Sequence, residues 1–176
     1  MVAITREIAM NAIHPEIHDA DTRREVDRWL GNYSEDHRNP TNILIHWICV
    51  PLIVWTAIAA LWTIPVPAML GRAGFWAGVA MFASLVFYLR LSKPLAFGML
   101  VVYVIMGVTC EALFRSLGAS GLLMLAGVIF VLAWIAQFVG HNIEGRRPAF
   151  FTDLVYLLIG PAWIVAKILR RVGIAY

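Results

Sequence analysis

The sequence predicts an all-α fold: a polytopic membrane helical bundle of four to five transmembrane helices with an N-terminal amphipathic helix. Hydrophobic residues make up 61% of the 176 residues and charged residues only 14%, whereas about a quarter of the residues in a soluble domain are charged. The apolar residues gather in segments that approach the length of a membrane helix, about 20 residues. No internal repeat divides the chain, so residues 1–176 are expected to form a single membrane domain.

The N-terminal part, residues 1–41, is polar and is expected to lie in the cytoplasm. Within it, residues 21–33 are predicted to form an amphipathic helix that rests on the membrane surface, with Val26, Trp29 and Leu30 on one face. The transmembrane bundle is expected over residues 42–171. Four of its segments are long and apolar enough to be predicted spans, namely residues 42–62, 74–89, 95–114 and 121–140.

A fifth apolar segment, residues 154–169, is interrupted by Gly160 and Pro161. With four spans, arginine and lysine are concentrated on the side that holds the N-terminus and the residues after Gly140, and that side is therefore expected to be cytoplasmic. If the fifth segment crosses the membrane, the basic residues at the C-terminus lie on the opposite side. A re-entrant or interfacial hairpin at the Gly-Pro pair would return them, and both arrangements remain open.

The first polar motif, DHRNPTNILIH, lies where the first predicted span begins. Pro40 suits the first turn of a helix and Asn39 suits its N-cap. His46 then lies about 9 Å inside the span, at 1.5 Å per residue, and His37 precedes the cap. The motif therefore predicts two histidines at one end of the bundle.

The second polar motif, QFVGHNIEGRRP, lies where the fourth predicted span ends. Because the first and fourth spans run in opposite directions, His141 and Glu144 are expected at the same membrane face as the first motif. Histidines with a carboxylate suit iron, zinc, copper or nickel, and two histidines with one carboxylate are typical of oxygen-activating ferrous sites. The two motifs together predict a metal site at this face.

Further polar residues of the two motifs are candidates for supporting roles. Glu144 is a candidate catalytic residue or a partner that orients a ligating histidine, and Asn42 and Gln137 are candidates for the same orienting role. Arg146 and Arg147 are candidates to pair with a substrate carboxylate. Their simpler interpretation is that they are basic anchors that reach lipid phosphates.

Other interpretations remain open at this point. A histidine at a helix end is more often a polar cap than a ligand, and His14 and His18 are expected to be exposed to solvent. Glu111 lies near the far end of the third span and is excluded as a ligand. A zinc-dependent lipid hydrolase would use similar ligands with a bound water. A non-catalytic transporter or scaffold would need polar residues at mid-membrane, where the spans are almost wholly apolar.

The stretches YSEDHRNPTNILIHWICVPLI and WIAQFVGHNIEGRRPAFFTDLVYLLIGPAW resemble the paired signatures of the Mpo-type membrane proteins. That family includes the fungal endoplasmic-reticulum enzyme that shortens 2-hydroxy fatty acids by one carbon. The spacing in HNIE looks like the bacterial branch of the family. The resemblance implies an Fe2+-dependent dioxygenase whose metal ligands are His37, His46 and His141.

The resemblance also implies the partners and the location. The expected partners are a 2-hydroxy fatty acid, dioxygen and membrane lipid, and the mild positive charge requires no nucleic acid. The protein is expected to be a multi-pass protein of a bacterial inner membrane, or of the endoplasmic reticulum if the source is eukaryotic. Its active site is expected on the cytoplasmic side.

Overall fold

The computed structural model describes residues 24–145 and 155–176. Every regular element in these residues is helical, which confirms the predicted all-α fold. The elements are α3 (Glu25–Glu35), α4 (Pro40–Trp62), the short 3-10 helix η1 (Ala68–Leu70), α5 (Phe75–Leu91), α6 (Lys93–Glu144) and α7 (Tyr156–Arg171).

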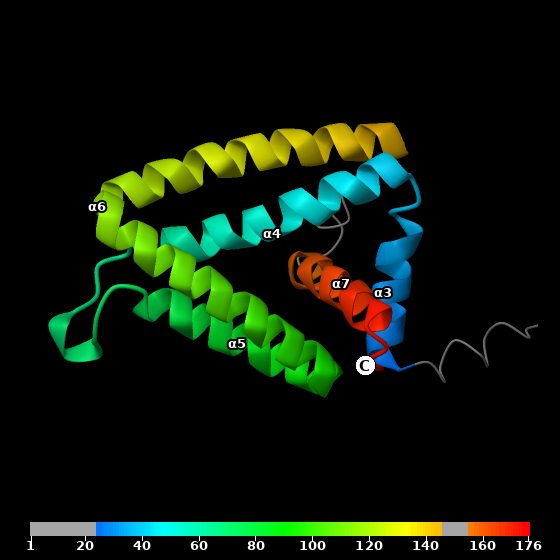
Figure 1. Cartoon of the computed structure of the whole chain (residues 1–176), viewed down its shortest axis with the longest axis horizontal. Helices are drawn as coiled ribbons and strands as arrows, with labels where there is room; N and C mark the ends of the chain where they lie inside the picture. The colour runs from blue at the N-terminus through cyan, green and yellow to red at the C-terminus, as the bar shows by residue number, and fades with distance from the viewer. Residues whose placement is uncertain (1–23, 146–154) are drawn as a thin grey trace, which may run out of the picture.

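Helix α6 folds back on itself at Gly118 (Figure 1). A straight helix of its 52 residues would be about 78 Å long, more than twice the thickness of a bilayer core, about 30 Å. Gly118 has φ 70° and ψ 179°, a backbone conformation that is essentially restricted to glycine. The fold-back produces two arms, residues 93–117 and 119–144, which match the third and fourth predicted spans.

The second arm of α6 runs beside α4, while its first arm packs with α5 (Figure 1). As a result, the start of α4 and the end of α6 lie together at one end of the bundle, and η1 and Gly118 lie at the other. Both α3 and α7 lie at the first of these ends (Figure 1). The expected meeting of the two polar motifs is therefore confirmed.

The surface of the long helices is apolar. By length and composition α4 and α6 are able to cross a membrane, whereas α5, with 17 residues, is shorter. Large apolar side chains remain exposed on α6, among them Phe97 at 67%, Val108 at 64% and Met124 at 72%. Soluble proteins rarely expose apolar surface on this scale, so the surface of these helices indicates membrane association.

The apolar face of α3 packs against other helices, whereas the sequence predicted that this helix rests on the membrane surface. The helix begins at Glu25, and residues 21–23 lie outside the described part of the chain. Val26 and Leu30 are buried at 1% and 5% exposure, and the ring of Trp29 meets that of Tyr156 edge-on at 5.5 Å. The apolar face of α3 therefore packs on α7 instead of facing lipid.

Helix α7 continues through Gly160 and Pro161, so the hairpin considered at this pair is not formed. Every residue from 159 to 166 is buried, and α7 packs against α3, α4 and α6. A proline inside a helix removes one backbone hydrogen bond, and dense packing against neighbouring helices makes such a loss tolerable. Tertiary packing thus accompanies a continuous helix at a Gly-Pro pair where the sequence left a break open.

Candidate metal centre

The connection between α3 and α4 positions His37. As predicted, α4 begins at Pro40, and the Asn39 side chain caps it by accepting a hydrogen bond from the Thr41 N–H at 2.9 Å. The connection is only four residues long, from 36 to 39. It therefore holds His37 over the first turns of α4, where the side chain meets that of His46.

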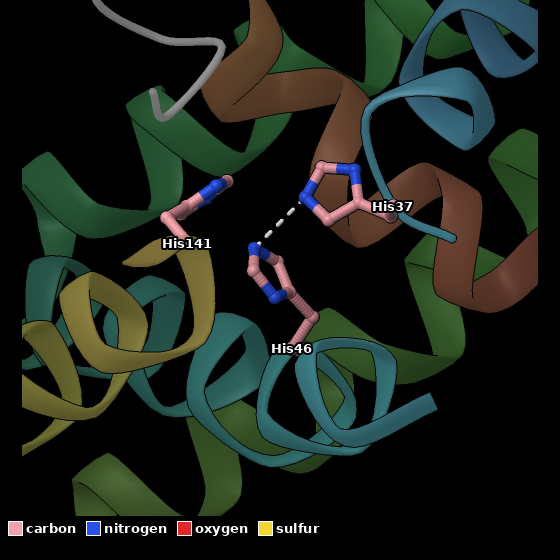
Figure 2. Close-up of side chains that lie close together, drawn as sticks. All are labelled: His37, His46 and His141. Atoms are coloured by element: carbon pink, nitrogen blue, oxygen red, sulfur yellow. Dashed lines mark hydrogen bonds between the residues drawn. The ribbon is translucent and has the colours of Figure 1, made fainter. Parts of the chain in front are cut away.

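Three histidines from different parts of the chain converge at this end of the bundle (Figure 2). His37, His46 and His141 are buried at 3%, 2% and 5% exposure. One nitrogen atom from each ring lies within 4.8 Å of the others. The ring centroids of His46 and His141 are 4.9 Å apart, and those of His37 and His46 are 4.2 Å apart. The histidine part of the predicted cluster is therefore present.

The hydrogen bonds of His37 and His46 determine which ring nitrogen carries the proton. His37 Nδ1 lies 2.6 Å from the carbonyl oxygen of Tyr33, and His46 Nδ1 lies 2.9 Å from that of Asn42. A carbonyl oxygen only accepts hydrogen bonds, so both Nδ1 atoms must donate. In the neutral rings both Nε2 atoms are then unprotonated, and they face each other at 3.0 Å (Figure 2).

Two lone pairs facing each other in a buried site require a cation between them. A proton is one possibility, but burial lowers the pKa of His37 and so disfavours its charged form. A metal ion is the other. Two nitrogen atoms bound at right angles to one ion, each at about 2.1 Å, lie about 3.0 Å apart. The observed separation of 3.0 Å therefore fits two adjacent ligands of one metal ion.

Two further features support the fit to a metal. Histidines that bind metals usually donate their second N–H to a carbonyl or carboxylate, as His37 and His46 do here. His141 Nδ1 is buried and has no hydrogen-bond partner within residues 24–145 and 155–176, and such an atom calls for an explanation. The three histidines could therefore hold a metal ion, and imidazole suits iron, zinc, copper and nickel alike.

Glu144 ties the end of α6 to the start of α4. Its carboxylate accepts hydrogen bonds from the backbone N–H groups of Arg38 at 3.0 Å and Asn39 at 2.9 Å. It also accepts one from the Asn42 side-chain amide at 3.0 Å. Both N–H groups lie just before the first turn of α4, where a negative charge is favoured. Glu144 therefore links the end of α6 to the start of α4.

Asn42 connects this carboxylate to the cluster. The side chain is fully buried, and its amide binds Glu144 while its backbone carbonyl accepts the hydrogen bond from His46. Gly140 makes room for it, because a Cβ atom at position 140 would collide with the Asn42 Oδ1 atom. The close approach of α4 and α6 at the histidines thus depends on the missing side chain of Gly140.

A pocket opens beside the three histidines. Gln137, which lies one turn before His141 on α6, forms part of its polar end. Val50, Ile53 and Val54 form its apolar wall. The pocket thus joins a group of metal-binding side chains to an apolar surface, as expected of a site for a molecule with a polar head and an apolar chain.

The remaining predicted residues lie elsewhere. Arg146 and Arg147, the candidates for a substrate carboxylate, lie outside the described residues, as do His14 and His18. Glu111 forms a salt bridge with Arg115 at 2.7 Å and is not part of the cluster, as expected. The thiols of Cys49 and Cys110 are free and buried.

Tyr33 is a site residue that the sequence analysis did not single out. Its ring stacks on His37 with centroids 4.2 Å apart and an angle of 16° between the planes. Its carbonyl oxygen accepts the hydrogen bond of the same imidazole. Tyr33 lies four residues before His37, and this spacing on a helix is the sequence signal that could have indicated the contact.

The sequence relationships agree with this geometry. The family model described as "2-hydroxy-palmitic acid dioxygenase Mpo1-like" matches residues 23–172, which include all three histidines. The chain belongs to the Mpo1-like family. It is also similar to the 2-hydroxy-palmitic acid dioxygenase MPO1 of Saccharomyces cerevisiae (strain ATCC 204508 / S288c), at 30% identity over 151 residues. This alignment covers 82% of the chain and 79% of the yeast protein. No solved structure matches the chain significantly.

Proposed function

We propose that this Mpo1-like protein is an Fe2+-dependent membrane dioxygenase that cleaves a 2-hydroxy fatty acid to the fatty acid one carbon shorter. The observation that carries the proposal is the pair of Nε2 atoms that face each other 3.0 Å apart, buried beside His141, while both Nδ1 atoms face carbonyl oxygens, in a member of a dioxygenase family. Such a pair needs a cation, and ferrous iron is the one that suits dioxygen chemistry at histidine ligands.

In this proposal His37, His46 and His141 hold the iron ion, which when bound supplies the electrons for dioxygen activation and binds the substrate. The backbone carbonyl groups of Tyr33 and Asn42 fix the orientation of two of the rings. Glu144 acts indirectly, by holding α4 against α6. Gln137 is proposed to orient groups at the polar end of the pocket.

Arg146 and Arg147 are proposed to pair with the substrate carboxylate, on the strength of their place in the sequence alone. Two guanidinium groups beside a carboxylate-binding site would give charge-assisted hydrogen bonds.

The fatty-acid chain is proposed to lie along Val50, Ile53 and Val54 in the pocket. These residues follow His46 along α4, away from the polar end of the helix. The acyl chain would therefore run from the histidines towards the middle of the bilayer. A site at the depth of the lipid headgroups accommodates both the carboxylate and the apolar chain of such a substrate.

For the topology, we propose that α4, α5 and the two arms of α6 each cross the membrane, within one membrane domain of residues 1–176. The exposed apolar surfaces of these helices support this arrangement. Basic residues predominate at the end of the bundle that holds the histidines, so this end is proposed to be cytoplasmic. The membrane would be a bacterial inner membrane, or the endoplasmic reticulum in a eukaryote.

The test is to purify the protein in detergent without oxygen, measure its metal content, and supply 2-hydroxypalmitate and dioxygen. One dioxygen molecule should be consumed for each acid, and the C1–C2 bond should break to give pentadecanoate, carbon dioxide and water. Palmitate, which lacks the 2-hydroxyl group, is the control substrate and should not be consumed. Tightly bound zinc without oxygen uptake would point to a lipid hydrolase, and a folded protein that binds no metal would contradict an enzymatic role.

A further inference from the structure

The Tyr33 side chain has a polar atom that the metal centre does not use. Tyr33 is 5% exposed and forms part of the wall of the histidine pocket. Its ring and its backbone carbonyl both contact His37. Its hydroxyl oxygen, in contrast, lies beside Gly160 of α7, in the lining of the same pocket.

The position of this hydroxyl group is set by α7. A Cβ atom built at Gly160 would lie 3.1 Å from the Tyr33 hydroxyl oxygen, and Gly160 lines the same pocket. Because position 160 has no side chain, nothing on this side of the pocket covers the phenol. The hydroxyl group therefore lies at the boundary between the histidines and the empty volume of the pocket.

The chemistry of the pocket indicates what the hydroxyl group could bind. No lysine or arginine is among the described residues that line it. A carboxylate there needs neutral hydrogen-bond donors in addition to any metal, and the donors outside the histidine rings include the Tyr33 hydroxyl and the Gln137 amide. A phenol is protonated near neutral pH and can therefore donate a hydrogen bond.

We propose that the Tyr33 hydroxyl group donates a hydrogen bond to the carboxylate of the 2-hydroxy acid and so helps to select an acid over other lipids. This inference rests on the proposed function and assigns a substrate-binding role to a residue outside the metal ligands. A hydrogen bond from a phenol to a carboxylate is charge-assisted and therefore strong.

The experiment compares Tyr33→Phe with the wild-type protein, both loaded with iron and kept without oxygen. The substitution removes the hydroxyl group but keeps the ring that stacks on His37 and the carbonyl that binds it. The ligands are 2-hydroxypalmitate and hexadecane-1,2-diol, which has a similar chain and vicinal oxygen atoms but no carboxylate. Iron content and the dissociation constant of each ligand are measured. Turnover of the acid then gives KM and kcat separately.

We expect Tyr33→Phe to keep its iron and to bind the acid about 10- to 100-fold more weakly, with unchanged binding of the diol, because one hydrogen bond to a charged group is lost. The KM for the acid should rise more than kcat falls. The matched control is Tyr88→Phe. The Tyr88 hydroxyl also contacts α7, by donating to the Leu158 carbonyl at 2.8 Å, but Tyr88 is not part of the pocket. It should bind both ligands normally.

Equal weakening of acid and diol, loss of iron, or normal binding of the acid by Tyr33→Phe would each overturn the inference. If Tyr33→Phe does not fold, Gly160→Ala provides the test. Its added Cβ crowds the hydroxyl group and should weaken binding of the acid more than that of the diol, and equal effects would overturn the inference. Failure of the wild-type protein itself to bind or convert 2-hydroxypalmitate would instead overturn the proposed function.

Discussion

The two ends of the helical bundle are held together by different kinds of contact. At the end with the histidines, Glu144 binds Asn39 and Asn42, which are more than 100 residues away in the sequence. Near Gly118 and η1, in contrast, the polar contacts at the chain reversals join residues closer in sequence, although Trp55 also donates a hydrogen bond to Thr109, 54 residues away. Arg115 binds Glu111 one helical turn away, and Trp76 binds the Pro65 carbonyl 11 residues away.

This difference follows from what each end has to do. The opposite end only reverses the direction of the chain, and glycine together with local contacts is sufficient for that. The histidine end must keep nitrogen atoms from three separate segments within a few ångströms of each other. Such a site needs its supporting contacts fixed in advance. Long-range hydrogen bonds to buried groups provide this, and a local salt bridge on a helix surface does not.

The largest expected effect is at the ligands themselves. His46→Ala or His141→Ala removes one of the three imidazoles, so iron content and oxygen uptake should both fall to the level of the metal-free protein. His18→Ala, which changes a histidine outside the cluster, should keep both. Metal analysis and oxygen-electrode measurements on protein purified without oxygen test this. Full iron content in the His141 variant would remove that residue from the ligand set.

Removal of the metal should have the next largest effect. The resulting loss of stability should depend on an intact histidine cluster. Because the ion binds only the folded protein, a chelator should lower the free energy of unfolding by about 3 kcal/mol if the metal was present at about 100 times its dissociation constant. Thermal unfolding in detergent, with and without the chelator, measures this. The His46→Ala protein should show no response, and a response as large as that of the wild type would contradict the assigned site.

A glycine substitution should separate the two helices at the histidine end. Gly140→Ala places a Cβ atom against Asn42, so we expect a loss of about 2 kcal/mol in unfolding free energy from overpacking. Iron affinity should fall as well. The control is Gly127→Ala on the same arm of α6, where nothing lies within 4 Å of the new Cβ atom. It should be neutral or stabilise by about 0.5–1 kcal/mol. Equal stability of the two variants would show that the close approach at Gly140 is not needed.

The smallest expected effect compares two glutamates of α6. Glu144→Gln keeps the size of the side chain but removes the charge from hydrogen bonds to two backbone N–H groups. Because the carboxylate is partly exposed to solvent, we expect a loss of only about 1 kcal/mol in stability, with a clearer drop in iron affinity. Glu111→Gln breaks a local salt bridge with an exposed arginine and should change neither quantity. Equal changes in stability and iron affinity in Glu144→Gln and Glu111→Gln would contradict the proposed difference between the two ends of the bundle.

The sequence alone determined the helices, the start of α4 and the convergence of the histidines. Hydrophobic stretches and the Asn39-Pro40 pair are local signals, and α4 begins at Pro40 as they predict. The alternating direction of consecutive helices then places His37, His46 and His141 at one end, without any knowledge of side-chain packing. These features depend on composition and on the order of elements along the chain, which a sequence contains in full.

Only the tertiary structure decided how the polar residues are used. The sequence left Glu144 with several possible roles, whereas in the fold its carboxylate accepts hydrogen bonds from the backbone N–H groups of Arg38 and Asn39, just before α4. The sequence left a hairpin at Gly160 and Pro161 open and predicted a lipid-facing α3, but the packing of α7 against its neighbours keeps α7 continuous and buries the apolar face of α3. The contacts of Tyr33 were equally undetermined. The physical reason is that a hydrogen bond or a packed face depends on which distant groups come within reach, and that is settled only when the helices assemble.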